Sequence, residues 1–279
     1  MAPPLTPTIE LNDGTTIPQV GFGVFQIEDE GAESAVTEAL DAGYRSIDTA
    51  KIYGNERGVG RAIAAADIPR EELYITTKVW NADQGFDATL HAFDRSMDRL
   101  GLDVLDLYLI HWPVPSKDQY LDTYRALIKL REDGRLRSVG VSNFTKVHLT
   151  HIIDETGIVP VLNQIELHPY FSQRQLVADN SALGVVTEAW SPLGQGRGIL
   201  ENAVLVEIAS RLGVSPAQVV LRWHLDRGIV VIPKSVTPAR IRENLDLMGV
   251  KLTIEDTNAI DALDTGKRFG PNPDTFDVT

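Results

Sequence analysis

The sequence predicts an α/β protein: a single (β/α)8 TIM barrel with an N-terminal β-hairpin and extra C-terminal helices. Strand-like and helix-like segments alternate along most of the chain, which is typical of parallel strands joined by helices. The expected strands are nearly continuous in Val, Ile and Leu, as in strands that are covered on both faces. A length of 279 residues without a linker or composition break fits one domain over 1–279. These features favour the closed barrel over an open, doubly wound sheet, which fits the same alternation.

The order of elements begins with a hairpin. Two strand-like runs flank Asn12-Asp13-Gly14, and Asp-Gly between such runs predicts a tight turn because both residues tolerate positive φ. Eight strands are then expected at "VGFG", "YRSIDTA", "LYITTKVW", "VLDLYLIHW", "LRSVGVSN", "VLNQIEL", "VVTEAWSP" and "IVVIPKS". Helical periodicity predicts helices at about 31–41, 56–66, 87–101, 120–134, 146–157 and 173–184, two more before 226, and a last pair at 238–245 and 254–263.

Composition excludes several classes of protein. The net charge of −13 disfavours nucleic acid as a partner, because phosphates would be repelled. Without cysteine the chain has no disulfides and no thiolate metal sites. No apolar run approaches the ~20 residues that span a bilayer, and "MAPPLTPTIE" lacks the basic and apolar regions of a signal peptide. We therefore expect a cytoplasmic protein with no membrane partner.

Polar residues stand at the C-terminal ends of the expected strands. In a parallel barrel these ends meet at one mouth, where active sites lie. Each residue alone also has a plain structural role: a strand-end histidine is commonly a hydrogen-bonded core residue, and an aspartate can cap the next helix. Three titratable types at the ends of successive strands nevertheless favour a site. The residues expected to converge are Asp48, Lys78, His111, Asn143, Gln164, Glu188 to Ser191 and Lys234.

Four of these side chains predict a particular chemistry, once Tyr53 on the adjoining loop is included. A tyrosine with a pKa of about 10 is a weak acid at neutral pH, and a nearby Lys78 ammonium would lower that pKa. Asp48 would supply the counter-charge that keeps the ammonium in place. A neutral His111 imidazole could hold a carbonyl oxygen by hydrogen bonding. The set predicts a proton donor aimed at a carbonyl that becomes an alkoxide.

A carbonyl that gains a proton at oxygen must gain hydride at carbon, which calls for a nicotinamide or flavin cofactor. The glycine-rich dinucleotide fingerprint is absent, because "GFGVFQ" has Gln26 at the third glycine position. The segment "VIPKSVTPARIREN" follows the last strand and opens a helix, where such barrels commonly bind phosphate. Lys234 and Arg240 there suit the 2′-phosphate of NADP, although a solvated basic helix start is an equal alternative. Trp190 could stack on a nicotinamide ring or lie in the core.

Several motifs match a known family: "GYRSIDTAKIYGNE", "TTKVW", "LDLYLIHWP", "GVSNF", "NQIELHP", "WSPLGQG" and "IPKSVTPARIREN". The chain resembles the aldo-keto reductases, and within them the bacterial 2,5-diketo-gluconic acid reductase-like branch. The resemblance runs over nearly the whole chain. It implies NADPH-dependent reduction of aldehydes, α-dicarbonyls or keto-sugars, with Tyr53 as the general acid, Lys78 and Asp48 lowering its pKa, and His111 orienting the carbonyl.

The resemblance also implies a cofactor site and a substrate pocket. Asn143 and Gln164 would hold the nicotinamide carboxamide, and Trp190 would stack on the ring. The full cofactor set is Ser142, Asn143, Gln164, Trp190, Ser191, Leu193, Gln195, Ile232, Lys234, Ser235, Val236, Arg240, Glu243 and Asn244. The expected substrate residues are Trp80, His111, Phe22 and Trp112, with Phe25 as a further wall residue. The loop after Trp190 and the tail after Leu263 are short compared with many members, so the substrate itself stays open.

Other hypotheses remain beside this one. Tyr74 and Lys78 fit the Tyr-x-x-x-Lys pattern of a short-chain dehydrogenase, although β-branched residues between them favour a strand over the helix that this pair requires. A non-catalytic NADP(H)-binding or sensor protein on the same fold is the alternative function. His148 and His151 have a spacing compatible with metal ligands but lack a carboxylate or cysteine partner, so no metal is expected. A monomer is the usual state of such a barrel.

Overall fold

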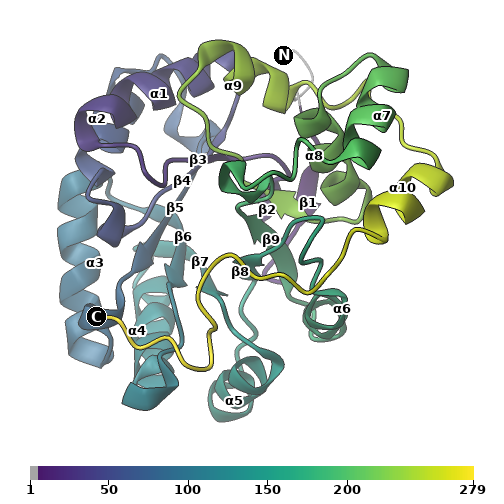
Figure 1. Cartoon of the computed structure of the whole chain (residues 1–279). Helices are drawn as coiled ribbons and strands as arrows, with labels where there is room; N and C mark the ends of the chain where they lie inside the picture. The colour runs from purple at the N-terminus through teal and green to yellow at the C-terminus, as the bar shows by residue number, and fades with distance from the viewer. Residues whose placement is uncertain (1–5) are drawn as a thin grey trace.

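Eight parallel strands form the centre of the molecule. The computed structural model describes residues 6–279. The strands follow one another around the sheet in chain order, and helices surround them (Figure 1). The strands are β3 (Phe22–Gly23), β4 (Ser46–Asp48), β5 (Tyr74–Val79), β6 (Leu105–Ile110), β7 (Leu136–Ser142), β8 (Leu162–Glu166), β9 (Val186–Trp190) and β10 (Val230–Val231). This arrangement confirms the predicted (β/α)8 barrel.

The ring closes between the chain segments around Val20 and Val231. These two residues form an isolated parallel bridge, in which Gly21 N donates to Val231 O at 2.8 Å. The close approach requires a glycine at position 23, since a Cβ there would lie 2.8 Å from the carbonyl oxygen of Ile232. The two glycines of "GFG" therefore serve barrel closure, and the absence of a dinucleotide fingerprint at this segment agrees with this role.

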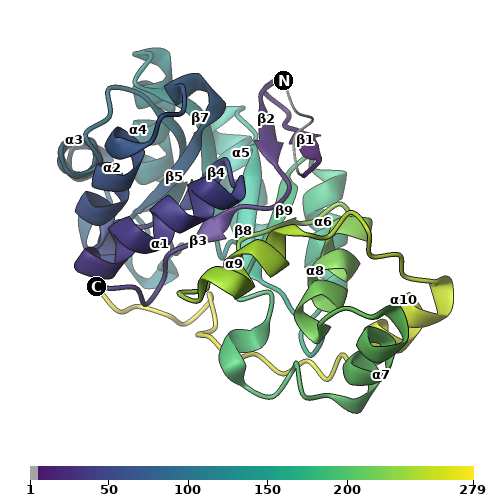
Figure 2. The same ribbon diagram turned by 90° about the horizontal axis from the view of Figure 1, so that it is seen from above.

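A ring of helices covers the outside of the barrel (Figure 2). The helices are α1 (Asp29–Ala42), α2 (Glu56–Ala65), α3 (Phe86–Leu100), α4 (Tyr120–Glu132), α5 (Lys146–Thr156), α6 (Arg174–Ala182), α7 (Ala203–Leu212), α8 (Pro216–Asp226), α9 (Pro238–Leu245) and α10 (Ile254–Asp261). Helix α7 packs against α8 and α10. Helices α9 and α10 are the pair predicted at the end of the chain, and each of them ends within two residues of its predicted boundary.

The predicted hairpin closes the floor of the barrel. Strands β1 (Thr8–Glu10) and β2 (Thr16–Pro18) pair antiparallel around a turn in which Gly14 has φ +83°. Ile17 and Leu11 pack with Leu107 and Val230 in one apolar cluster. The mouth at the other end of the strands is therefore left for ligands.

Within residues 6–279 no single helix is long and apolar enough to cross a membrane. Helices α7 and α8 would suffice together by length and composition, but they are bent by 91° relative to each other.

Candidate active site

The structure brings together Asp48, Tyr53, Lys78 and His111 at the mouth. Asp48 ends β4, Lys78 lies near the end of β5, and His111 directly follows β6. Tyr53 ends the short 3-10 helix η1 (Lys51–Tyr53). The Lys78 ammonium lies 5.3 Å from the centre of the Tyr53 ring, and the ring centres of Tyr53 and His111 are 5.8 Å apart. These four residues lie in the grouping that the sequence predicts.

Lys78 is a fully buried cation with two hydrogen-bond acceptors. Its ammonium donates to Asp48 Oδ1 at 2.6 Å and to the carbonyl of Thr49 at 2.9 Å. Burial alone would lower the pKa of Lys78, but the Asp48 carboxylate and the Tyr53 phenol raise the pKa above its ordinary value. The side chain therefore keeps its charge at neutral pH.

The pKa of Tyr53 differs from the expectation in its direction and in the effect of Asp48. Burial raises the pKa of its phenol above 10, Lys78 lowers the pKa, and the Asp48 carboxylate raises it. Asp48 thus opposes ionisation of the phenol and does not promote it, because a second negative charge nearby is unfavourable. The phenol therefore keeps its proton at neutral pH, which is the state that a proton donor needs.

His111 is held as a neutral imidazole. It is 9% exposed, and burial followed by the charge of Lys78 places its pKa well below the ordinary value. Among the described residues, its buried Nδ1 has no hydrogen-bond partner. The ring also packs edge-on against Trp80, with 5.2 Å between ring centres. A neutral ring in this position can hydrogen-bond to an uncharged ligand atom.

Asn143 and Trp190 are linked across the ends of β7 and β9. Trp190 Nε1 donates to Asn143 Oδ1 at 2.8 Å, and Asn143 Nδ2 donates to His111 O and to Ser142 Oγ, each at 3.0 Å. Asn143 has φ +63° and Ser191 has φ +51°, conformations that non-glycine residues seldom adopt. Such strain is common where backbone is shaped for a ligand.

Gln164 joins Asp48 to a second buried acid. Its Nε2 donates to Asp48 Oδ2 at 2.8 Å and to Glu188 Oε2 at 2.9 Å. Both amide hydrogens are therefore engaged, so the carboxamide orientation is fixed. The sequence predicts Glu188 among the strand-end residues of the mouth, but no pattern in the sequence indicates its burial beside Gln164.

The last strand and α9 carry the predicted phosphate-binding residues. Lys234 and Arg240 are exposed, and within residues 6–279 neither forms an ion pair. By contrast, Arg242 on the same helix pairs with Glu38. Pro238 and Arg240 lie in the first turn of α9, where backbone N–H groups have no partner within the helix, and Lys234 precedes the helix by four residues. This combination fits a phosphate group.

The remaining predicted cofactor residues lie in the loop after β9 and between the end of β10 and the end of α9. Gln195 Nε2 donates to Ser191 Oγ at 2.6 Å, and both lie after β9. Ser235, Asn244 and Ile232 are buried, Leu193 and Glu243 are half-buried, and Val236 is exposed.

One predicted substrate residue does not reach the mouth. Phe22 is 1% exposed and packs edge-on against Tyr44 in the core, so the prediction for Phe22 is wrong. Its neighbour Phe25 is 44% exposed and contacts the Tyr53 ring at 5.1 Å between centres. The alternation of side chains along the strand sends position 22 outward to the helices.

An apolar wall forms from residues far apart in the sequence. Trp112 packs on Phe276 with 4.5 Å between ring centres, and Trp80 lies 6.5 Å from the same ring. Phe276 belongs to the C-terminal segment 264–279, called the tail below. Its role was not predicted because the tail has no helical or strand periodicity.

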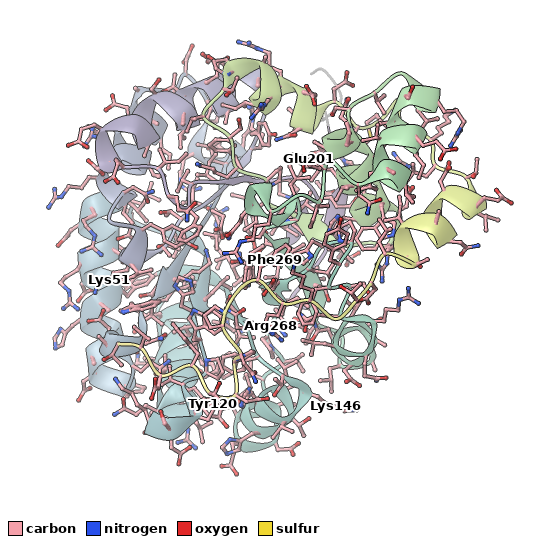
Figure 3. All side chains as sticks on the ribbon, in the orientation of Figure 1. Lys51, Tyr120, Lys146, Glu201, Arg268 and Phe269 are labelled. Atoms are coloured by element: carbon pink, nitrogen blue, oxygen red, sulfur yellow. The ribbon has the colours of Figure 1, made fainter. Side chains whose placement is uncertain are left out.

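The tail crosses the mouth, as the yellow trace in Figure 1 shows. Glu166 at the end of β8 anchors it: the carboxylate accepts the backbone N–H groups of Phe269 and Gly270 and a hydrogen bond from His168. Phe269 is labelled on the tail in Figure 3, over the centre of the barrel. Asn81 Nδ2 donates to Val278 O at 2.7 Å and holds the far end. Sequence reasoning missed this anchor because "NQIELHP" gives no sign of its distant partners.

The alternative motifs have other roles. Tyr74 and Lys78 both lie on strand β5, and Tyr74 packs in the apolar floor cluster, so they do not form a helical Tyr-Lys pair. His148 completes the N-terminal capping box of α5 with Thr145, and His151 Nδ1 lies 2.6 Å from the Tyr120 hydroxyl.

Comparison with known proteins agrees with the geometry. The model of the Aldo/keto reductase family matches residues 19–265. An aldo-keto reductase of Mycolicibacterium smegmatis is 55% identical over 99% of this chain and 100% of its own. The methylglyoxal reductase DkgA of Yersinia pestis is 52% identical over 98% of each chain. The crystal structure of a Gox0644 mutant in complex with NADPH superposes with a TM-score of 0.93 at 46% identity, covering 97% of this chain and 98% of that one.

The chain belongs to the aldo/keto reductase family. It is therefore an oxidoreductase, and its DkgA relatives confirm the predicted bacterial 2,5-diketo-gluconic acid reductase-like branch.

Proposed function

We propose that this protein reduces small aldehydes, α-dicarbonyls and keto-sugars to alcohols at the expense of NADPH. The observation that supports this most directly is the packing of Tyr53 against the buried Lys78–Asp48 pair and His111 at the open end of the barrel. The relatives named methylglyoxal reductase support an α-dicarbonyl as one substrate.

Each of the four residues has a part in the proton transfer. Tyr53 donates its proton to the carbonyl oxygen as negative charge develops there. Lys78 stabilises the phenolate that remains, and Asp48 keeps Lys78 in place and charged. Neutral His111 donates a hydrogen bond that orients the carbonyl oxygen toward the phenol.

Residues at the ends of the strands and at the start of α9 would hold the cofactor. Bound NADPH would supply hydride to the carbonyl carbon. Trp190 would support the nicotinamide ring, while Asn143 and Gln164 would present their side-chain oxygens to its carboxamide, since their amide hydrogens are already donated. Lys234 and Arg240 at the start of α9 would bind the 2′-phosphate. Two exposed cations that form no ion pair within residues 6–279 support NADPH over NADH.

The substrate would lie between the four residues and the apolar wall of Trp80, Trp112 and Phe276. Aromatic walls of this kind accept small apolar carbonyls, and sugars stack on them as well. The proposal therefore covers both classes of carbonyl.

The test follows NADPH absorbance with methylglyoxal, glyoxal, simple aldehydes and 2,5-diketo-gluconate. Wild-type protein should consume NADPH, and Tyr53→Phe should lower kcat by about 10²–10⁴-fold with little change in NADPH affinity. Full activity of Tyr53→Phe would refute the assignment of the acid. Tight NADPH binding without turnover of any carbonyl would instead favour a non-catalytic sensor.

A further inference from the structure

Glu188 is a buried acid that the proposed proton transfer leaves without a role. It lies in the middle of β9, with Gln164 as its register partner on β8 and Val230 on β10. The side chain is inside the barrel, and its residue is 2% exposed. Its Oε2 accepts a hydrogen bond from Gln164 Nε2, whose second acceptor is Asp48. One amide thus connects Glu188 to the Lys78–Asp48 pair.

The charged and titratable groups that face Glu188 come from three elements. Asp48 is on β4, Lys78 and Tyr74 are on β5, and Tyr53 is on η1, whereas Val230 of β10 is apolar. Burial and then the Asp48 carboxylate raise the pKa of Glu188 to about 8, against smaller lowering effects of Gln164 and Lys78. Burial and the Asp48 charge thus both favour the protonated form of Glu188, and with Glu188 neutral the Lys78–Asp48 pair leaves the interior close to neutral.

We propose that Glu188 is a positioning residue that fixes the amide of Gln164 and that, by losing its proton, makes the site favour the oxidised cofactor over the reduced one. This inference rests on the proposed function, because it places the nicotinamide ring at Gln164 and Trp190. It identifies a proton-linked control of cofactor redox state in a residue outside the four that act on the carbonyl.

The physical reason is the difference in charge between the two forms of the cofactor. The ring of NADP⁺ carries a positive charge, and the ring of NADPH is neutral. An ionised Glu188 turns the neutral interior into one of net charge −1, which attracts the cationic ring and leaves the neutral ring nearly unaffected. By linkage, binding of NADP⁺ should release the Glu188 proton to solvent, and the affinity for NADP⁺ should rise as pH passes through the pKa of Glu188.

The tyrosines and the lysine that face Glu188, and His111 nearby at the mouth, have pKa values shifted away from the range between pH 7 and 9. Burial raises the pKa of both Tyr53 and Tyr74, and the pKa of Lys78 is raised by Asp48 despite its burial. His111 has a pKa well below 6.5 because it is buried beside Lys78. The 2′-phosphate is present in both cofactor forms, so its ionisation cancels in the ratio of their affinities. Between pH 7 and 9 the ratio therefore reports Glu188.

The experiment measures dissociation constants of NADP⁺ and NADPH by fluorescence at pH 7, 8 and 9. In the wild type, the preference for NADP⁺ relative to NADPH should grow about three- to tenfold over this range. In Glu188→Gln the ratio of the two affinities should not change with pH, because glutamine keeps the shape of the side chain but does not ionise. Glu207→Gln removes the same charge from an exposed site on α7 and should retain the wild-type change.

A second measurement keeps the test independent of the variant. Calorimetry at pH 8 in two buffers of different ionisation enthalpy should show that NADP⁺ binding releases a larger fraction of a proton than NADPH binding. Equal proton release, or a flat affinity ratio in the wild type, overturns the role of Glu188 even if carbonyl reduction is observed. If neither cofactor binds, the proposed function is wrong and this inference is wrong with it.

Discussion

The Lys78 ammonium lies 2.6 Å from the Asp48 carboxylate, with exposed side-chain fractions of 0% and 3%. An isolated buried charge is costly, whereas a paired and hydrogen-bonded one is tolerated. Each member of this pair is therefore stable in the barrel only while the other is present.

Lys78→Met should lower the free energy of unfolding by about 3–5 kcal/mol, because it leaves the Asp48 carboxylate buried without its cation. Asp48→Asn should cost a similar amount for the converse reason. The double variant Lys78→Met/Asp48→Asn should recover part of the loss, since no uncompensated charge remains. Urea unfolding of all four proteins measures this coupling. Strictly additive losses would contradict it.

Arg240→Ala should weaken NADPH binding by about ten- to hundredfold and leave NADH binding nearly unchanged, because only NADPH has the 2′-phosphate. The matched control is Arg242→Ala, which removes a cation from the same helix that is already paired with Glu38. Its effect on both cofactors should be small. Fluorescence titration of the wild type and both variants provides the six dissociation constants, and an equal loss for NADPH and NADH in Arg240→Ala would exclude a phosphate contact.

Gly270→Ala should loosen the tail. A Cβ at this position would lie 2.4 Å from Cη2 of Trp190 and 3.2 Å from Oε2 of Glu166, so the backbone must move away from its anchor. Hydrogen exchange of residues 264–279 should become faster, and KM for carbonyl substrates should rise by more than kcat falls. Gly249→Ala is the control, because its Cβ would meet nothing within 4 Å. Unchanged exchange in Gly270→Ala would show that the tail adapts without strain.

Acid should destabilise the protein through buried His224. Burial lowers the pKa of His224 to about 4, although hydrogen bonds to the carbonyls of Val220 and Leu167 raise it in part. Between pH 6.5 and about 4 the unfolded chain binds a proton at this site that the folded chain does not. The free energy of unfolding should therefore fall by about 1.4 kcal/mol per pH unit on acidification through this window.

Urea unfolding at pH 7, 6 and 5 measures this dependence. His224→Gln should be less sensitive to pH than the wild type. His91→Gln removes an exposed histidine and should keep the wild-type slope. If the free energy of unfolding of His224→Gln falls with acidification as steeply as that of the wild type, other groups cause the acid sensitivity.

Much of the fold was predictable because local patterns and global topology agree. Strands rich in apolar residues such as Leu105–Ile110 favour burial on both faces, and the hairpin turn at Gly14 follows from its backbone freedom. The four residues at the mouth were predictable because parallel strands bring their C-terminal ends together. The assignment of one domain over 1–279, and the roles of the site residues, stay predictions that the tests above address.

Other features depend on contacts that a sequence pattern does not contain. The inward or outward direction of Phe22 depends on strand register, which "VGFGVF" leaves ambiguous by one residue. The anchoring of Phe269 and Gly270 by Glu166 joins residues more than 100 positions apart. The raised pKa of Glu188 and the effect of Asp48 on Tyr53 depend on burial and on distances between strands. These quantities become visible only once the barrel is closed.

The bridge between Val20 and Val231 joins residues 211 positions apart. A ribosome adds about 5–20 residues per second. The first strand segment of the barrel, around Val20, is therefore synthesised about 10–40 s before the segment around Val231 with which it pairs. For that time one edge of the nascent sheet exposes unpaired N–H and C=O groups, which can recruit strands from other chains. The protein should therefore depend on chaperones, or on slow expression at low temperature, more than its compact final form suggests.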